Sequence, residues 1–175
     1  MTIKKVVQTS DPLLHTASRL VVDFHSPEVL ETVSDLINTM IEENLIGMAA
    51  PQIGKSLQIF VTEIRKTKYR NPQEIDILRV FVNPQIINCS KEVISGFEGC
   101  GSLREPALFV KITRPKKITV NGYNQLGESF SLDAEGLLSR VIQHEIDHLQ
   151  GIVCIEKQEE IITEEEYLKM INQQL

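Results

Sequence analysis

The sequence has no apolar run long enough to cross a membrane. A membrane-spanning helix needs roughly 18 mostly apolar residues, and the apolar stretches here are far shorter. The run Val6–Val7, which follows two lysines near the N-terminus, is also too short for the apolar part of a secretory signal peptide. We therefore expect no membrane partner and a cytoplasmic location.

The sequence also lacks the features of a disulfide-stabilised or multidomain protein. It contains three cysteines, an odd number, and it has no internal repeat, low-complexity stretch or linker. A chain of 175 residues can bury a sizeable core without disulfides. We therefore expect one domain over residues 1–175, and at least one cysteine used as a metal ligand or a nucleophile.

An overall basic surface is missing as well. The net charge is −6, whereas proteins that bind nucleic acids need lysine and arginine to meet the phosphates. A local basic run at Lys111, Arg114, Lys116 and Lys117 is typical of a solvated strand edge. We therefore predict no direct binding of nucleic acid.

Three segments have the apolar spacing or the end signals of helices. Residues 27–44 follow Ser26, a good N-cap, and begin with Pro27. Residues 134–150 have Asp133 as a plausible N-cap and Gly151 as a stop signal. A third helix at about 163–175 begins with an arrangement that resembles a capping box.

The middle of the chain has the short β-branched runs of strands. Turn residues separate these runs, and residues 65–76 form a polar stretch that we expect to be an exposed loop. The expected strands are residues 57–64, 80–83, 85–88, 108–113, 117–123 and 128–132. A helix followed by strands and further helices predicts an α+β fold, with helices packed on mainly antiparallel sheets.

The second expected helix contains the sequence His144-Glu145-Ile146-Asp147-His148. Histidines four residues apart lie on one face of a helix, so both can reach one metal ion. The carboxylate of Glu145 can then reach a water held by that ion. The apolar spacing predicts this helix without the motif, so we expect a metal-binding HExxH motif on a central helix.

A catalytic metal site needs a third protein ligand and an open fourth position for water. No histidine follows His148. A zinc endopeptidase would use a downstream glutamate, for which Glu164, Glu165 and Glu166 are the candidates. These carboxylates are better placed to stabilise the start of a helix.

The cysteines are the remaining soft ligands. Cys100 lies in the glycine-rich run 96–102, which we expect to be a loop between strands where the backbone can approach a bound group closely. Cys89 and Cys154 have more apolar neighbours, so we interpret both as inert buried thiols.

Three motifs, in order along the chain, resemble those of peptide deformylases. Residues 143–148 match Gln-His-Glu-x-Asp-His completely. Residues 98–102 match Glu-Gly-Cys-Leu-Ser except that Gly101 replaces the leucine. Residues 45–52 match Gly-apolar-Gly-apolar-Ala-Ala-x-Gln except that Leu45 replaces the first glycine. The resemblance extends over about residues 5–155.

The resemblance implies a metal-dependent hydrolase that removes the formyl group from N-formylmethionyl peptides and releases formate. One Fe²⁺ or Zn²⁺ ion would be held by Cys100, His144 and His148. Glu145 would take a proton from the attacking water and deliver it to the leaving amine. The side-chain amide of Gln52 would stabilise the developing oxyanion, together with the backbone N–H of residue 101.

The resemblance also implies where the peptide binds. Gly47 would line the substrate cleft, in which the peptide lies as an added strand. Leu45, Glu98 and Gly99 belong to the same motifs, so we assign them to substrate binding as well. Contact between the last dozen residues and the ribosome is left open.

The departures at Leu45 and Gly101 allow two interpretations. The chain is either a working deformylase with local variation, or a relative whose reshaped pocket gives weak activity or acts on another N-acyl peptide. A non-catalytic protein is a further alternative. A closed site with four ligands, including Cys154, would indicate it.

Overall fold

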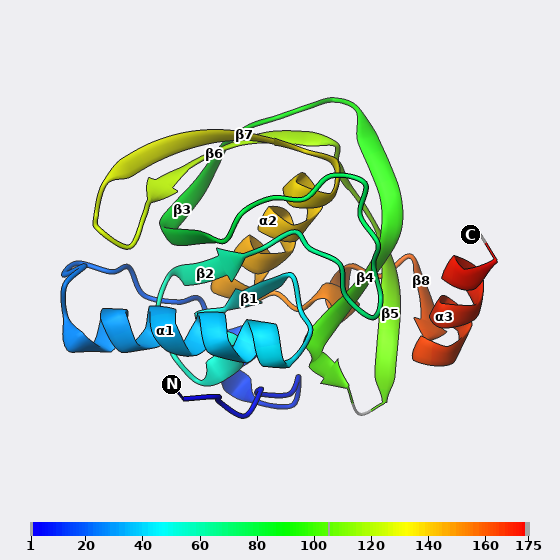
Figure 1. Ribbon diagram of the computed structural model, residues 1–175, viewed down its shortest axis with the longest axis horizontal. Coiled ribbons are helices and arrows are strands. Elements are labelled where there is room, and N and C mark those ends of the chain that lie inside the picture. The colour runs from blue at the N-terminus through cyan, green and yellow to red at the C-terminus, as the bar shows by residue number, and fades with distance from the viewer. Residues whose placement is uncertain (1, 105, 174–175) are drawn as a thin grey trace.

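The computed structural model describes residues 2–104 and 106–173, and it confirms an α+β fold with antiparallel sheets (Figure 1). One sheet has the strand order β1-β2-β3-β6-β7 and the other the order β4-β5-β8. The five-stranded sheet consists of β1 (Gly47–Ala49), β2 (Ile59–Thr62), β3 (Arg79–Cys89), β6 (Lys117–Tyr123) and β7 (Ser129–Glu135). The second sheet consists of β4 (Val93–Arg104), β5 (Ala107–Pro115) and β8 (Glu160–Thr163).

The α-helices of the described residues are α1 (Pro27–Glu42), α2 (Gly136–Leu149) and α3 (Glu164–Asn172). None of these helices is long and apolar enough to cross a membrane. Short 3₁₀ turns occur at Pro12–His15, Ala50–Ile53 and Cys154–Lys157.

Two helices cover opposite faces of the five-stranded sheet. Ile59 and Val61 of β2 pack with Leu36 of α1, whereas Phe60, between them, packs with Ile142 of α2. Successive side chains of a strand point to opposite faces, so α1 and α2 lie on the two sides of β2 (Figure 1). This burial on both faces explains why β2 begins with three consecutive apolar residues, Ile59–Val61.

The ends of α1 agree closely with the prediction. The Ser26 side chain accepts a hydrogen bond from the backbone of Val29, and Pro27 is the first helical residue. The helix ends at Glu42 rather than at residue 44, because Asn44 adopts a left-handed conformation with φ 55°.

The predicted start of α2 was wrong. Residues 133–135 belong to β7, where Asp133 pairs with Thr119 of β6, so Asp133 is not the N-cap. Gly136, with φ 60°, turns the chain from the strand into the helix. The predicted stop is confirmed, since Gly151 has φ 76° just after the helix.

Two expectations about strands were also wrong. Residues 80–83 and 85–88 form one strand, β3, with an irregularity at Asn83, whose φ is 50°. Cys100 lies in β4 rather than in a loop, because Val93–Gly99 pairs residue by residue with β5 and thereby extends the strand through the glycines.

Two expectations about burial failed as well. Cys89 is exposed, at the end of β3, while Cys154 is buried as predicted. Arg114 is 4% exposed and therefore does not belong to a solvated strand edge. Both errors arise because a local run of sequence does not show which face of a strand meets the rest of the protein.

The predicted third helix is confirmed in position. The Thr163 side chain and the Glu166 side chain cap the first turn of α3 reciprocally. The helix packs on the second sheet through Tyr167, which stacks on Phe109 of β5 with ring centroids 3.9 Å apart. Residues 174–175 of the predicted helix lie outside the described residues.

Gly151→Ala should lower the free energy of unfolding by about 3 kcal/mol or more. A left-handed alanine costs about 1 kcal/mol, and its Cβ would also lie 2.7 Å from the backbone N of Thr16, which is an overlap that only a main-chain shift can relieve. Urea unfolding measures the loss. The matched control is Gly54→Ala, at φ 78° with no atom within 4 Å, which should lose about 1 kcal/mol. Equal losses in the two variants would contradict this account.

Candidate active site

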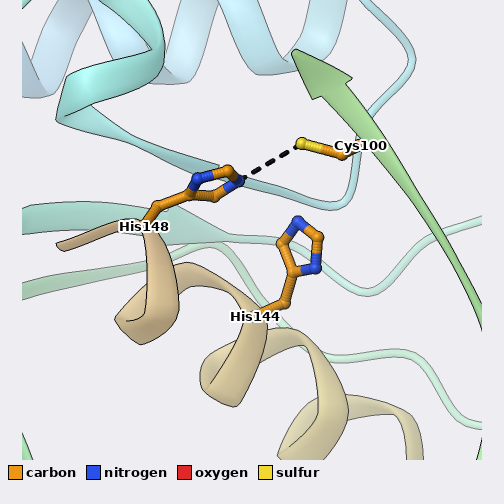
Figure 2. Close-up of side chains that lie close together, drawn as sticks. All are labelled: Cys100, His144 and His148. Carbon is orange, nitrogen blue, oxygen red and sulfur yellow. Dashed lines mark hydrogen bonds between the residues drawn. The ribbon is translucent and has the colours of Figure 1, made fainter. Parts of the chain in front are cut away.

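Cys100, His144 and His148 come together in the interior. Their possible ligand atoms all lie within 4.8 Å of one another, and the Cys100 Sγ is 3.2 Å from the Nε2 of His148. Figure 2 shows the two imidazoles on successive turns of α2, with the thiol of β4 facing them. The predicted ligands, which are 44 and 48 residues apart in sequence, therefore form one cluster.

Glu98 orients the first imidazole. Its Oε2 accepts a hydrogen bond from the Nδ1 of His144 at 2.9 Å, which leaves the Nε2 of this histidine directed to the cluster. The Glu98 carboxylate is 3% exposed and also accepts hydrogen bonds from the guanidinium groups of Arg114 and Arg140. Burial alone would raise the pKa of Glu98, but the hydrogen bonds from Arg114 and His144 hold it well below its ordinary value.

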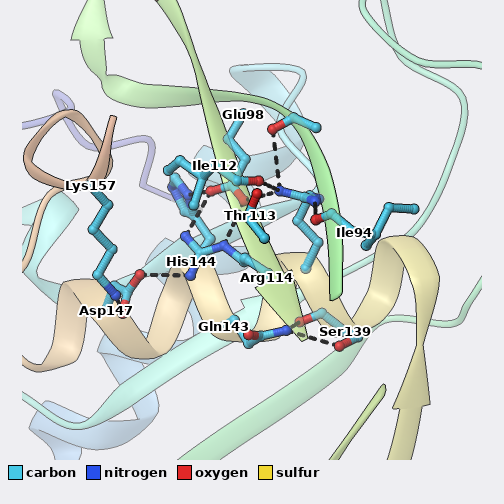
Figure 3. A network of polar contacts seen from close by, with 12 residues as sticks. Ile94, Glu98, Ile112, Thr113, Arg114, Ser139, Gln143, His144, Asp147 and Lys157 are labelled. Carbon is cyan, nitrogen blue, oxygen red and sulfur yellow. Dashed lines mark hydrogen bonds and ion pairs between the residues drawn. The ribbon is translucent and has the colours of Figure 1, made fainter. Parts of the chain in front are cut away.

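Arg114 connects two carboxylates of this network (Figure 3). It forms two hydrogen bonds to Glu98, at 2.6 and 2.8 Å, and a third to Asp147 at 2.8 Å. Asp147 lies between the two histidines in sequence and also binds Lys157 at 2.6 Å. The network fixes β4 and β5 to the helix that presents the imidazoles, so the distance between the thiol and the imidazoles is set by buried ion pairs.

The cluster suits a soft or borderline divalent metal ion. Cysteine and histidine are the preferred ligands of such ions. A hydrogen bond from Cys154 and the nearby His148 outweigh burial and hold the pKa of Cys100 well below its ordinary value, and the thiolate is the form that binds metals. Among the described residues the ligand group contains these three side chains and not Cys154, which favours an open site.

Glu145 is buried beside the cluster and points toward β1. A Cβ added to Gly47 would lie 2.5 Å from the Oε1 of Glu145, so only glycine permits this close approach. The Oε2 of Glu145 is buried and has no hydrogen-bond partner among the described residues. Burial raises the pKa of Glu145 to about 7. The carboxylate therefore has an unused oxygen and exchanges its proton near neutral pH.

Gln52 is oriented by the backbone that precedes it. Its Oε1 accepts a hydrogen bond from the N–H of Ala49 at 2.8 Å. The amide Nε2 is thereby directed to the Oγ of Ser102 and the Sγ of Cys100, at 3.4 and 3.6 Å. An amide N–H donor thus faces the candidate metal ligand Cys100.

A single cleft joins these groups. All the predicted site residues line it except His148, which is fully buried. The lining residues that were predicted are Leu45, Gly47, Gln52, Glu98, Gly99, Cys100, Gly101, His144 and Glu145. The carboxylate oxygens of Glu98 are occupied by the network described above, so a direct contact of Glu98 with substrate stays a prediction.

Sequence reasoning missed the arginines of the site. Arg140 is one helical turn before His144, and its guanidinium donates to Glu98 at 2.7 Å and to the backbone carbonyls of Ile94 and Ile112 at 2.6 and 2.9 Å. The i, i+4 spacing to His144 could have indicated Arg140. No local signal marks Arg114, because its partners come from other elements.

The downstream glutamates do not join the cluster. The Glu164 carboxylate accepts hydrogen bonds from Lys68 and from the hydroxyl of Tyr69, both at 2.8 Å. Glu166 caps its own helix. Among the described residues, the ligand group includes none of the three glutamates, so the site lacks the third ligand that a zinc endopeptidase of this kind would need.

Comparison with known proteins finds one family, by sequence and by structure. The family model described as polypeptide deformylase matches residues 3–164. The chain is 38% identical over 166 residues to a peptide deformylase of Natranaerobius thermophilus, covering 95% of this chain and 99% of the relative. A peptide deformylase of Carboxydothermus hydrogenoformans is 36% identical over 162 residues, covering 93% and 97%. The crystal structure of a Met-Ala-Ser-bound class I type b peptide deformylase from Acinetobacter baumannii is similar with a TM-score of 0.83 and 28% identity, covering 89% of this chain and 99% of that one.

Replacing Arg114 should destabilise the protein strongly. Arg114→Met leaves two buried carboxylates with one cationic partner fewer each, and loss of one member of a buried ion pair costs about 3–5 kcal/mol. Thermal and urea unfolding measure the effect. In the control Arg19→Met, the exposed ion pair with Glu28 is removed, and stability should change very little. If the two substitutions had similar effects, the buried network would not be what holds the second sheet to α2.

Metal binding should distinguish the two buried cysteines. Cys100→Ala removes one of three ligands, so the affinity for Zn²⁺ should fall by at least about 100-fold. Cys154→Ala should keep one bound ion per chain, and the exposed Cys89→Ala serves as the matched control. Zinc titration with a competing chelator gives the affinity for Zn²⁺ and the number of ions bound per chain. A Cys154→Ala protein that lost its metal as readily as Cys100→Ala would indicate a closed four-ligand site.

Proposed function

Since this chain belongs to the polypeptide deformylase family, we propose that it hydrolyses the formyl amide of N-formylmethionyl peptides and releases formate. The observation that carries this proposal is the arrangement of the cleft. A Cys-His-His ligand group, a buried carboxylate and an amide N–H donor face one another there. These are the parts that metal-assisted amide hydrolysis requires.

We propose one Fe²⁺ or Zn²⁺ ion per chain, held by Cys100, His144 and His148. Both ions accept thiolate and imidazole ligands, and metal availability often decides between them. When bound, such an ion acts as a Lewis acid that activates water and polarises the formyl carbonyl. Glu98, through its hydrogen bond to His144, supplies the outer partner that keeps a ligating imidazole in orientation.

The two sheets offer free edges for a peptide. β1 is the edge of the five-stranded sheet and β4 the edge of the three-stranded sheet. Gly47 of β1 and Gly99 of β4 both line the cleft. A peptide that lies between them as an added strand would exchange main-chain hydrogen bonds with either edge. The Met-Ala-Ser bound to the neighbour from Acinetobacter baumannii supports a short peptide that begins with methionine as the occupant of the cleft.

Glu145 is the group that moves the proton. Its free Oε2 and its pKa of about 7 suit a residue that accepts a proton from the attacking water. The oxygen of that water bonds to the formyl carbon, the C–N bond breaks, and Glu145 delivers the proton to the leaving amine. Formate and a peptide with a free N-terminal methionine are the products.

Gln52 and the backbone of Gly101 are the proposed oxyanion donors. The Nε2 of Gln52 already faces Cys100, and Gly101 follows this ligand directly. Fixed donors at the position where negative charge develops stabilise the transition state more than the substrate. Loss of one such donor typically lowers the rate by about 10² to 10³.

Three further expectations belong to the same proposal. Residues 1–175 act as a single catalytic domain, the protein works in the cytoplasm, and α3 is available for contact with the ribosome. The last of these rests only on the position of α3 at the periphery, packed on the second sheet through Tyr167.

Formate release from formyl-Met-Ala-Ser by the Fe²⁺-loaded protein, prepared without oxygen, tests the function. Turnover should fall by about 10² to 10⁴ in Glu145→Ala, since that is the range of a lost general base. Glu31→Ala, on the outer surface of α1, should retain full activity. A fully metallated wild-type protein that released no formate would refute the proposal, and the same samples should then be tested on other N-acyl peptides.

A further inference from the structure

The backbone around Gly101 is not held by its neighbouring strand. The pairing of β4 with β5 runs regularly to Gly99, opposite Phe109, and resumes only at Arg104, opposite Ala107. Four residues of β4, Cys100–Leu103, therefore lie opposite the single residue Leu108 of β5. Such a bulge frees backbone groups from the ladder, and glycine at position 101 adds conformational freedom that must be lost on ordering.

The N-terminal segment holds this bulge from one side. The side-chain amide of Gln8 donates to the carbonyl oxygen of Gly101 at 3.3 Å, and its Oε1 accepts from the N–H of Arg104 at 3.2 Å. The N–H of Thr9 donates to the carbonyl of Ser102 at 3.0 Å. Gln8 thus connects Gly101 within the unpaired stretch to Arg104, where the pairing resumes.

Leu45 holds the bulge from the other side. A Cβ added to Gly101 would lie 2.8 Å from the Cδ1 of Leu45, 3.6 Å from the Cγ1 of Val6 and 3.9 Å from the Nε2 of Gln52. The leucine side chain therefore occupies the space into which a side chain at position 101 would point. The two departures from the deformylase motifs, a leucine at 45 and a glycine at 101, are in direct contact.

The main chain of Leu45 is itself fixed. Its N–H donates to the carbonyl of Met40 at 3.0 Å, and the N–H of Asn44 donates to the carbonyl of Ile41 at 3.1 Å, which together form a Schellman ending of α1. The carbonyl of Leu45 accepts a hydrogen bond from Arg65 at 2.9 Å. The side chain thus projects from a rigid anchor.

We propose that Leu45 and Gln8 are positioning residues that hold the peptide unit of Gly101 in the orientation the reaction requires. Leu45 fills, from the end of α1, the space beside Gly101 into which a side chain at this position would point, and Gln8 binds the carbonyl oxygen of Gly101. The exchange of leucine and glycine between the two segments is reciprocal and preserves the cleft wall. This inference rests on the proposed role of the Gly101 N–H as an oxyanion donor.

A double-substitution cycle tests the reciprocity. Gly101→Leu alone should lower the melting temperature by roughly 2–8 °C, because the new side chain overlaps Leu45. Leu45→Gly alone should lower it by a similar amount through the lost packing. The double variant Leu45→Gly/Gly101→Leu should recover to within about 2 °C of the wild type. Additive losses would overturn the reciprocal exchange, whether or not the protein has deformylase activity.

Kinetics of the metal-loaded protein test the positioning role. In Leu45→Ala, kcat for formyl-Met-Ala-Ser should fall about 10- to 100-fold with KM changed less than about threefold, because the oxyanion interaction forms only in the transition state. Leu45→Met, which keeps most of the volume, should recover most of the kcat that Leu45→Ala loses. Ile37→Ala is the matched control, since Ile37 is half-buried in the same cluster on α1 and lies outside the cleft lining. An equal fall of kcat in Ile37→Ala would reduce Leu45 to a structural role.

The role of Gln8 is tested with Gln8→Met, for which Gln58→Met is the control. Gln58 also binds a backbone carbonyl, that of Ser18 at 3.3 Å, but neither residue lines the cleft. In the Zn²⁺-loaded protein, the ¹⁵N order parameter of the residue 101 amide should fall from about 0.85 toward 0.6 in Gln8→Met and in Leu45→Ala only. An unchanged order parameter together with unchanged kcat would overturn the proposal. If the wild type released no formate, the proposed function would fail instead, while the melting and relaxation data would still decide the packing.

Discussion

The buried carboxylate of Glu98 is the constraint on which the rest of the site depends. It lies on β4, yet its hydrogen-bond partners come from β5 and α2, namely Arg114, Arg140 and His144. A buried ion that lost these partners would be very costly, so the second sheet and α2 can pack in essentially one way. The thiol of Cys100, two residues along β4, is thereby brought to the imidazoles of α2.

Because of this arrangement, different elements supply different groups of the site. The central helix, covered by the five-stranded sheet, presents His144, Glu145 and His148 from a rigid and buried frame. The edge of the second sheet supplies Cys100 and the backbone of Gly101. The cleft lies beside β1 and β4, which are edge strands of the two sheets. In the proposed mode of binding, a peptide would extend the two sheets while its end reaches the ligand group.

The contact between Leu45 and Gly101 changes how the two motif departures are interpreted. Taken one at a time, a leucine in place of glycine would narrow the cleft, and a glycine in place of leucine would widen it. The structure places one side chain in the space left by the other. Under the proposed exchange, the leucine at 45 fills the space that a side chain at 101 would take, so the two departures together need not change the shape of the cleft wall.

The sequence by itself determined the helices with strong periodicity, the α+β class and the pair of histidines, because these features arise from spacing within one segment. The sequence also indicated Cys100 as the third ligand. Its glycine-rich surroundings favoured it over the other two cysteines, and the order of the three motifs then identified it. The first turn of α2 was misjudged, since pairing of β7 with β6 outweighed the capping preference of Asp133. Tertiary structure alone decided the burial of Arg114 and the contact of Leu45 with Gly101. Each of these depends on which residues distant in sequence share one small volume, and a linear pattern does not carry that information.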